Sequence, residues 1–244
     1  MITSPQNEKL KLVRKLRERR QRDREGLFVT EGEDLLDAGR AAGVEPSVLL
    51  TAPGAGLGGD EVGADLLAEV SALGSGTRAI AVWPQRWAAG VEAPCVYLDA
   101  VGDPGNVGAI VRTAAALLGG TVVLGPDCAD PHGPRAVRAS MGAIFAQPLA
   151  RAGVEATAEP RAAMVARGGS APEALEGCAT ICLGAEREGL RPEVLDRCQR
   201  RVTIPLRPGA VESLNVAAAA AIALERVASA ASRSDSAQAS EREK

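Results

Sequence analysis

Short apolar runs alternate with amphipathic segments along most of the 244 residues, a pattern that predicts an α/β protein. An apolar run of about five residues between turn signals is typical of a buried strand, whereas apolar positions three or four apart are typical of a helix. The alternation is interrupted at 84–94, which holds two prolines and no clear period, and we interpret this segment as a linker. Before it we expect strands at 26–30, 47–51 and 77–83 and helices at 7–22, 34–42 and 60–73.

After the linker the alternation starts again. The helix expected at 213–228 is almost entirely apolar, so it must be covered by this core or by another subunit. The polar segment 229–244 is expected to be disordered. The pattern thus predicts a small α/β domain over 1–90, a larger one over 91–228 and a tail. In the larger domain we expect strands at 95–99, 120–124, 179–183 and 201–204, a short strand or turn at 143–148, and helices at 107–118, 135–140, 159–167 and 192–197.

One strand-to-helix turn carries most of the candidate chemistry. It is the stretch VGDPGNVGAIVRTA, residues 101–114, and Asn106 occupies a position typical of a helix N-cap. The free backbone N–H groups of such a helix start, together with the guanidinium of Arg112, suit an anion such as phosphate. The glycine spacing is not G-x-G-x-x-G, so the dinucleotide-binding fingerprint is not met. On this stretch alone, an ordinary strand-to-helix turn is an equal alternative.

Charge is distributed unevenly along the chain. The net charge is −3, but residues 1–25 hold nine Lys and Arg against four acidic residues. A basic arm on an acidic protein fits a polyanionic partner such as RNA, and the alternative is a solvated helix face. The chain has only five aromatic residues, too few for a base-stacking platform, so RNA would be bound by phosphate, shape and polar contacts. The residues of this arm that we expect to contact RNA are Lys9, Lys11, Arg14 and Lys15.

The cysteine and histidine content argues against several kinds of site. Five cysteines without a C-x-x-C pair indicate reduced, buried thiols, not a disulfide framework or a zinc site. The single histidine, His132, argues against a histidine-based metal site or a catalytic triad elsewhere in the chain, and we expect no metal. No apolar run is long enough to span a membrane and no secretory signal is visible, so we expect a cytoplasmic protein.

Three loops follow predicted parallel strands, at 101–108, 184–190 and 205–213. In open α/β sheets, ligands bind beside the carboxyl ends of the strands. With neither a P-loop nor a general-base histidine, such a polar site fits group transfer from a reactive cofactor better than hydrolysis. The side chains in or near these loops that we expect to act are Asn106, Arg112, Glu186, Ser213 and Asn215.

The same loops carry a family resemblance. Residues 103–114, 183–190 and 204–217 resemble motifs 1, 2 and 3 of the SpoU/TrmH RNA 2′-O-methyltransferases, in order and at similar spacing. Residues 138–143 also resemble the element that connects these motifs. The resemblance covers about 94–228, and 5–90 is similar to the ribosomal-protein-like RNA-binding domain that often precedes it.

The resemblance implies a SPOUT fold, which is a parallel sheet with helices on both faces and a C-terminal trefoil knot. It also implies a homodimer, S-adenosyl-L-methionine as cofactor, and methylation of a ribose 2′-OH in rRNA or tRNA. Asn106, Arg112, Glu186, Ser213 and Asn215 match the family's active-site positions. The backbone groups that would hold the cofactor are those around Leu183, Gly184, Ile204, Pro205, Leu206, Ser213 and Leu214.

Two site residues need a physical interpretation. Arginine is the family's proposed proton acceptor, but a guanidinium is effectively always protonated, so we expect Arg112 to clamp the phosphate of the target nucleotide. Glu186 is expected to orient Arg112 or another cation. Two positions depart from the family pattern. Arg187 stands where glycine is frequent, which predicts a looser loop or an RNA contact, and Ala217 stands where serine is frequent.

Other functions stay open at this point. A non-catalytic RNA-binding protein of the same fold is one alternative, although the active-site positions are filled. A nucleotide-dependent dehydrogenase is another, although the glycine fingerprint is absent. Among methyltransferases, the additional N-terminal domain favours folded large-subunit rRNA over a tRNA loop. Housekeeping modification and antibiotic resistance use the same chemistry, and the sequence does not separate them.

Overall fold

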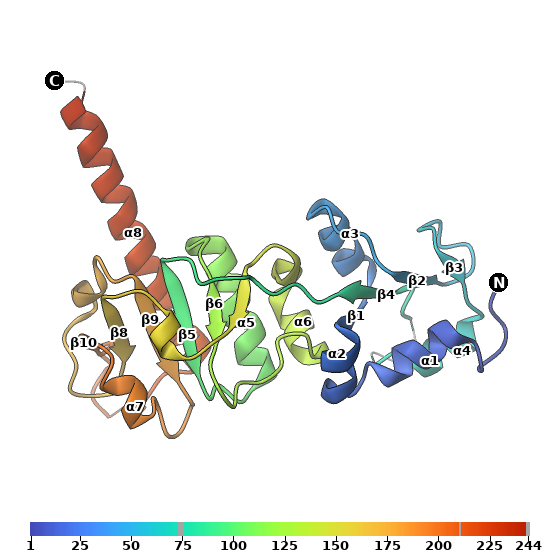
Figure 1. Ribbon diagram of the computed structural model, residues 1–244, viewed down its shortest axis with the longest axis horizontal. Coiled ribbons are helices and arrows are strands. Elements are labelled where there is room, and N and C mark those ends of the chain that lie inside the picture. Colours follow the sequence, from blue (N-terminus) through green and yellow to red (C-terminus); the bar gives the residue numbers. More distant parts are fainter. Residues whose placement is uncertain (73–75, 210, 243–244) are drawn as a thin grey trace. The chain divides into compact units, whose positions relative to one another are not determined.

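The chain forms two compact units in the computed structural model (Figure 1). The structure describes residues 1–72, 76–209 and 211–242, and it describes side chains as far as residue 233. The first unit consists of Met1–Arg86 with Asp130–Ala146, and the second of Trp87–Ala129 with Gln147–Lys244. The segment 130–146 therefore belongs to the first unit, although it lies in sequence between two parts of the second.

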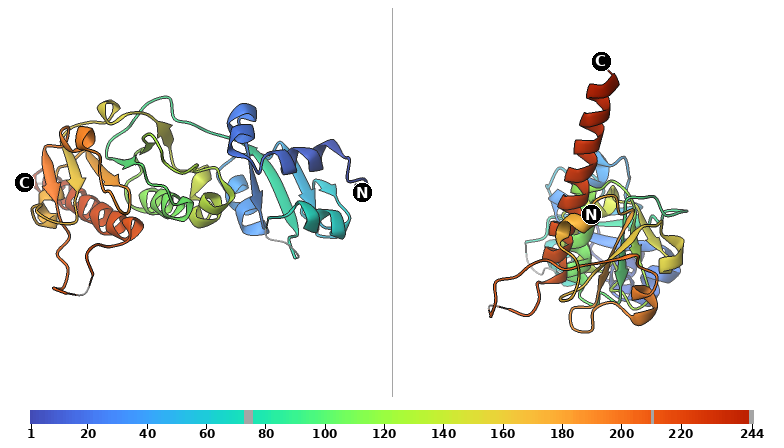
Figure 2. Two further views of the ribbon diagram at one scale, coloured as in Figure 1. Left: turned by 90° about the horizontal axis from the view of Figure 1, so that it is seen from below. Right: turned by 90° about the vertical axis from the view of Figure 1, so that its left-hand side faces the viewer.

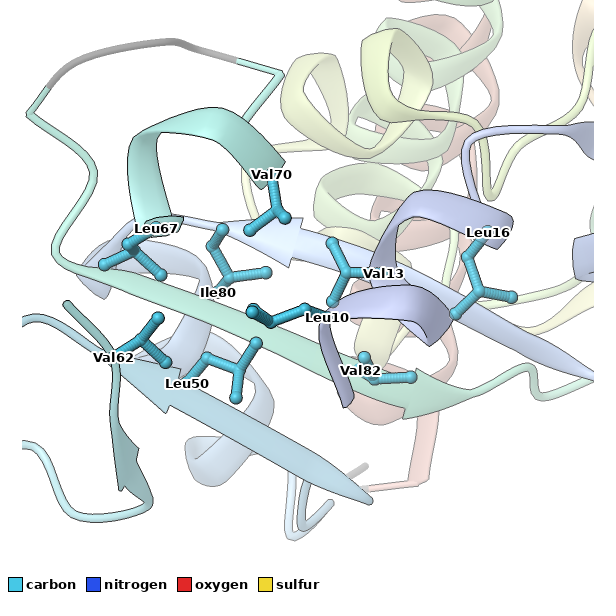
Figure 3. Packing of buried hydrophobic residues seen from close by; sticks show 9 residues of the cluster. All are labelled: Leu10, Val13, Leu16, Leu50, Val62, Leu67, Val70, Ile80 and Val82. Atoms are coloured by element: carbon cyan, nitrogen blue, oxygen red, sulfur yellow. The ribbon is translucent and has the colours of Figure 1, made fainter. Parts of the chain in front are cut away.

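The first unit is built on a four-stranded sheet in the order β1-β4-β2-β3. β1 and β2 both pair antiparallel with β4, and β2 pairs parallel with β3. Leu10, Val13 and Leu16 of the N-terminal segment are buried in one hydrophobic cluster with the strand residues Leu50, Ile80 and Val82 (Figure 3). The elements before the second unit are α1 (Glu8–Lys15), α2 (Arg19–Glu25), β1 (Leu27–Glu31), α3 (Glu33–Ala41), β2 (Val48–Thr51), β3 (Asp60–Glu61), α4 (Ala64–Val70) and β4 (Ala79–Pro84).

The basic arm is two short helices and not the single helix expected over 7–22. The chain turns between α1 and α2, and the guanidinium of Arg22 lies inside the turn. It donates to the carbonyl oxygens of Leu16 at 2.8 Å and Arg17 at 2.7 Å, and its Nε donates to the Asp130 carboxylate at 2.8 Å. Arg22 is only 5% exposed. Because it satisfies carbonyls at the end of α1 that have no partner within the helix, it stabilises the break.

The segment 130–146 packs on the first unit through aromatic contacts as well. Its elements are α6 (Pro134–Ser140) and the 3₁₀ helix η1 (Ala143–Phe145). The ring centroid of Phe145 lies 4.7 Å from that of Trp83 and 5.7 Å from that of Phe28, and His132 lies 4.9 Å from Phe28. These side chains form an aromatic packing cluster within the first unit.

The second unit contains a six-stranded sheet in the order β10-β8-β9-β5-β6-β7, with every neighbouring pair parallel (Figure 2). The central strand β5 is buried along its whole length, as its continuous apolar run predicted. The parallel α/β architecture expected from the sequence is therefore confirmed. Its elements are β5 (Cys95–Asp99), α5 (Pro104–Leu117), β6 (Val122–Leu124), β7 (Leu149–Arg151), η2 (Val154–Ala156), β8 (Arg161–Met164), η3 (Pro172–Leu175), β9 (Thr180–Gly184), α7 (Pro192–Leu195), β10 (Arg200–Val202) and α8 (Val216–Arg242).

One strand of this sheet was predicted wrongly. Residues 159–167 were expected to be helical, but 161–164 form β8 between β9 and β10. Ala162 and Ala163 are fully buried there. Alanine favours helices when a segment is considered alone, whereas here strand pairing on both sides determines the conformation. At 143–148, η1 replaces the short strand that was one of the two expected conformations, and β7 follows it.

The last helix differs from the prediction at both ends. α8 begins at Val216 and continues beyond Ala228, where a disordered tail was expected, to Arg242; residues 243–244 lie outside the described residues (Figure 1). Ala223 and Leu224 are fully buried, and α8 packs against α5, whereas Ile222 stays 39% exposed. Within the described part of the chain, none of the helices combines the length and the apolar character that a membrane span requires.

We predict that Arg22→Ala destabilises the first unit by about 3–5 kcal/mol, because it leaves the Asp130 carboxylate buried without its cation and two helix-end carbonyls without a donor. Urea unfolding followed by tryptophan fluorescence measures the effect. Arg20→Ala, which removes an exposed cation from the same helix α2, is the matched control and should change stability by less than about 0.5 kcal/mol. Equal stability of the two variants would contradict this role of Arg22.

Candidate active site

A chain of side-chain hydrogen bonds joins three loops of the second unit. The Asn215 Nδ2 donates to the Asn106 Oδ1 at 3.0 Å, and the Asn106 Nδ2 donates to the Glu186 Oε1 at 2.6 Å. These residues are separated by 109 and 80 positions in the sequence. The structure thus brings together three of the five side chains that were expected to act.

The start of α5 fixes Asn106. The helix begins with Pro104, and Asp103 is its N-cap: the Asp103 Oδ1 accepts the backbone N–H of Asn106 at 3.0 Å. The expectation that Asn106 itself is the N-cap is therefore corrected. Asn106 lies in the first helical turn, and its amide is available for the neighbouring loops because Asp103 carries out the capping.

The start of α8 fixes Asn215 in a complementary way. The Asn215 Oδ1 accepts the backbone N–H of Ala217 at 2.9 Å, which is the hydrogen bond of an N-cap. Since this oxygen faces the helix, the Nδ2 is the atom left to donate to Asn106. The orientation of both amides in the chain follows from these partners.

The loop 184–190 is closed tightly on itself. Ala185 and Gly189 exchange two backbone hydrogen bonds, at 3.1 and 3.0 Å. A Cβ on Gly184 would lie 2.1 Å from the carbonyl carbon of Gly189, so only glycine fits there. The looser loop that Arg187 suggested is not observed, and the Arg187 side chain is exposed.

A cavity of about 450 Å³ adjoins this loop, within the size range of small-molecule sites. Its wall includes all but one of the residues whose backbone was expected to hold the cofactor, namely Leu183, Gly184, Ile204, Leu206, Ser213 and Leu214, together with Glu186. Residues 164–167, which follow β8, also line it and were missed. The mistaken helix at 159–167 hid them, since a strand there would have placed its end at the same sheet edge.

A buried ion pair that the sequence did not reveal lies at the same edge. Asp99 ends β5 and is fully buried, and its carboxylate accepts the backbone N–H and the Nε of Arg191, each at 2.8 Å. The hydrogen bonds that the Arg191 side chain donates to Asp99 raise the pKa of Arg191 above its usual range. Arg191 directly follows the loop 184–190, so Asp99 ties the end of that loop to β5. The only sequence signal is an acidic residue at the end of an apolar strand.

Two of the expected active-site residues stay outside the hydrogen-bonded chain. Arg112 is exposed on α5 and makes no hydrogen bond or ion pair with any other residue that the structure describes. Ser213 is exposed at the cavity wall. Glu186 was expected to orient a cation such as Arg112, but its hydrogen-bond partner is the amide of Asn106.

The basic residues expected to contact RNA lie in α1 of the first unit, and each has an acidic partner in its own unit. Lys11 lies 2.8 Å from Glu8, Arg14 lies 3.0 Å from Glu69, and Lys15 lies 2.6 Å from Glu25. Lys9 pairs with Asp60. All four side chains are partly exposed, so these are surface pairs of small energy.

Burial is the main cause of the raised pKa values of three other groups in the second unit, Tyr97, Cys95 and Cys128. Desolvation, with a smaller effect from Asp99, raises the pKa of Tyr97 to about 12. Burial raises the pKa of the Cys95 and Cys128 thiols, and all five cysteines are free. No cluster of metal-binding side chains is present in the ranges that the structure describes.

We predict that Gly184→Ala lowers stability by about 1–3 kcal/mol, because the added methyl group forces the loop 184–190 away from its position. Urea unfolding, with amide hydrogen exchange at 185–190, measures the change. Gly90→Ala is the matched control, since a Cβ there meets no atom within 4 Å. Unchanged exchange in the loop of the Gly184 variant would contradict the packing described here.

The comparisons with known proteins agree with this architecture. A tRNA/rRNA methyltransferase of Mycobacterium tuberculosis is 39% identical over 140 residues, which are 52% of this chain and 48% of the relative, so the chain spans about half the length of that relative. The 23S rRNA (guanosine(2553)-2′-O)-methyltransferase RlmP of Bacillus subtilis is 29% identical over 91% of this chain and 96% of its own. The AdoMet-bound rRNA methyltransferase from Sinorhizobium meliloti has a TM-score of 0.79 at 27% identity, with 92% of this chain and 95% of that chain covered.

Family matches cover both parts of the chain. The MRM3-like substrate binding domain matches residues 7–82. The SpoU rRNA Methylase family matches residues 93–225, which is more than half of the chain and contains all three loops of the hydrogen-bonded chain. This protein therefore belongs to the SpoU rRNA Methylase family.

Proposed function

We propose that this protein transfers a methyl group from S-adenosyl-L-methionine to a ribose 2′-OH of structured RNA, with large-subunit rRNA as the substrate. The observation that carries the proposal is the hydrogen-bonded chain Asn215–Asn106–Glu186, which adjoins the cavity through Glu186. It combines polar groups at the carboxyl edge of a parallel sheet with a cavity of cofactor size, as a group-transfer site requires.

The cavity suits the cofactor chemically. The side chains of Leu183, Ile204, Leu206 and Leu214 give it an apolar wall on which an adenine ring can pack. Glu186, Glu188 and Glu212 place three carboxylates in the same wall against two guanidiniums, those of Arg167 and Arg187. The excess of negative charge suits a ligand with a sulfonium and an ammonium group. Gly184 contributes only backbone to the wall, and the side on which a Cβ would stand is occupied by the backbone of Gly189.

The residues of the chain act mainly by alignment. When bound, the cofactor supplies a methyl group on a positively charged sulfur, which becomes neutral on transfer. Alignment of two reactants can lower the barrier by about 7–11 kcal/mol. We assign Asn106 to the ribose and Asn215 and Glu186 to the orientation of Asn106, because their hydrogen bonds fix both ends of its amide.

Arg112 is assigned to the phosphate of the target nucleotide. Its exposed guanidinium has no protein partner in the described structure, so its donors are available for bidentate binding. As the methyl group moves from sulfur to the 2′ oxygen, the 2′-OH proton must leave, and an oxygen of the bound phosphate can accept it and pass it to solvent. Ser213, at the cavity wall, is assigned to the same site.

The substrate class rests on the relatives and on the additional N-terminal domain. The relative from Bacillus subtilis is a 23S rRNA methyltransferase, and the domain matched at 7–82 is a substrate-binding one. We assign Lys9, Lys11, Arg14 and Lys15 to the RNA backbone.

The substrate class is tested by mapping the nucleotide that loses its 2′-O-methyl group when the gene is removed. Loss from tRNA would favour the tRNA alternative. Absence of methyl transfer to total RNA, with RNA binding retained, would favour a non-catalytic member of the fold.

Further family features belong to the proposal. They are a trefoil knot in the methyltransferase domain, 91–228, a homodimer formed by that domain, and RNA binding by the domain 1–90. Ile222 is a large apolar side chain of α8 that is 39% exposed, which supports a contact with a second subunit. An enzyme that modifies ribosomal RNA would act in the cytoplasm. Sedimentation of the purified chain tests the dimer.

We predict that Arg112→Ala lowers kcat for methyl transfer by about 100-fold or more while cofactor binding is retained, because the target ribose loses its alignment. Single-turnover transfer of labelled methyl groups to rRNA and calorimetric titration of the cofactor measure the two effects. Arg197→Ala, another exposed arginine of this unit, should leave both unchanged. Loss of cofactor binding in a folded Arg112 variant would contradict the assignment.

We predict that, at neutral pH, Asn106→Asp lowers kcat for methyl transfer more than Asn106→Ala does. The aspartate loses the donor to Glu186 and places two carboxylates at hydrogen-bond distance, where like charges repel. Alanine removes the hydrogen bond to Glu186 but adds no charge. Comparison of kcat for the two variants, with circular dichroism as the control for folding, tests this order. Equal activity of the two variants would show that the contact with Glu186 does not matter.

A further inference from the structure

The first unit contains a cavity of its own, of about 340 Å³, for which the proposed chemistry has no use. It shares no residue with the cavity of the second unit. α1, β1, α3, α4 and the segment 130–146 all contribute to its wall. The residues that the argument uses are the apolar Val13, Leu35 and Val137 and the charged Arg17, Asp34 and Arg138.

The inner wall is apolar and rigid. Val13, Leu35 and Val137 belong to α1, α3 and α6, and each is at most 5% exposed. A flat, weakly hydrated ring would lose little by leaving water for such a wall. Phe28, Trp83 and Phe145 pack on one another and do not line this cavity. A bound ring would therefore contact aliphatic side chains and guanidinium planes.

One carboxylate at the wall is available to a ligand. Asp34 is exposed, and its side chain makes no hydrogen bond or ion pair with the residues that the structure describes. It lies in the first turn of α3, where the helix dipole favours a negative charge. Glu31, the other acid of the wall, already accepts from the Ser71 hydroxyl at 2.6 Å and the Ala72 N–H at 2.7 Å.

The backbone at Gly32 is shaped to leave room for this carboxylate. Gly32 has a φ of +104°, and a Cβ on it would lie 2.6 Å from the Asp34 Oδ1. Any side chain at position 32 would thus displace Asp34. The positive φ of residue 32 is the stronger reason for glycine there, since other residues rarely adopt it.

Two cations complete the site. Arg17 and Arg138 are both exposed at the cavity. Arg138 has no hydrogen-bond or ion-pair partner in the described part of the chain, and Arg17 makes only a hydrogen bond of 3.2 Å to the Glu69 carbonyl and a longer one of 3.5 Å to that of Ser71. Guanidinium groups beside an apolar cavity suit a nucleotide phosphate.

The single carboxylate indicates which base fits. The Watson–Crick edge of guanine presents two adjacent N–H donors, which match the two oxygens of a carboxylate. Adenine and cytosine each place a ring acceptor beside their amino group, and uracil has a single N–H between two carbonyls. A base can be recognised by this edge only when it is unpaired.

We propose that this cavity holds an unpaired guanine of the RNA substrate, with Asp34 on its Watson–Crick edge and Arg17 and Arg138 on its phosphate. The RNA part of this inference rests on the proposed function. The site would select a nucleotide other than the one methylated and would thereby position the RNA.

The binding site is tested with mononucleotides on the full chain. Guanosine 5′-monophosphate should shift the amide NMR signals of Gly32, Leu35 and Val137, and it should bind about tenfold more tightly than the adenosine, cytidine and uridine monophosphates. Asp34→Asn should remove this preference. Asp37→Asn, which alters an exposed acid of the same helix outside the cavity, should keep it. Arg138→Ala should weaken all four nucleotides alike, and Arg86→Ala should weaken none.

Three results would overturn the proposal. These are equal binding of the four nucleotides, shifts confined to residues outside the cavity, and the same shifts from inorganic phosphate alone. A separate measurement connects the site to the reaction: Asp34→Asn should raise KM for rRNA while kcat stays unchanged, and an unchanged KM would also overturn the proposal. If the unaltered protein transfers no methyl group, the proposed function fails, whereas the nucleotide test still decides the guanine site.

Discussion

The active-site arrangement depends on one hydrogen-bonded chain, from Asn215 through Asn106 to Glu186. Each of these bonds contributes only about 0.5–3 kcal/mol to stability, so their main effect is orientation. An amide can be held in one orientation only if both of its ends have partners. The Asn215 oxygen caps α8, and Glu186 fixes the opposite end of Asn106. Three loops must therefore meet at one sheet edge, which a parallel sheet provides because its strands all end on the same side.

In each unit an ion pair with a buried carboxylate holds two segments of the backbone together. In the second unit Asp99 joins the end of β5 to Arg191, directly after the loop that carries Glu186. In the first unit Arg22 joins α2 to Asp130 and to the end of α1. Such pairs add little net stability compared with apolar packing, but breaking one leaves a buried charge. They are therefore best understood as constraints that permit a single path of the chain.

The N-terminal arm contributes less to the electrostatic attraction of RNA than its nine basic residues indicate. Lys9, Lys11, Arg14 and Lys15 are paired with acids of the same unit, and Arg22 is buried. RNA must compete with these partners for the paired side chains. Cations without an acidic partner, such as Arg17 and Arg138, are then the more effective groups. Binding of RNA by this unit would consequently depend on shape and on specific side chains as well as on net charge.

The sequence by itself determined the alternation of strands and helices, the parallel sheet of the second unit and the three loops with Asn106, Glu186 and Asn215, because these follow from local apolar runs and turn residues. The residues of the cofactor wall came from the resemblance of 183–190 and 204–217 to the family's motifs, and the cavity contains all of them except Pro205. Tertiary structure alone decided the remainder. Residues 161–164 form a strand because strands pair with them on both sides. The basic arm is divided into two helices where Arg22 pairs with Asp130. Asp99 pairs with Arg191, which is 92 positions away in the sequence. Each of these depends on a partner distant in the sequence, which no local pattern can specify.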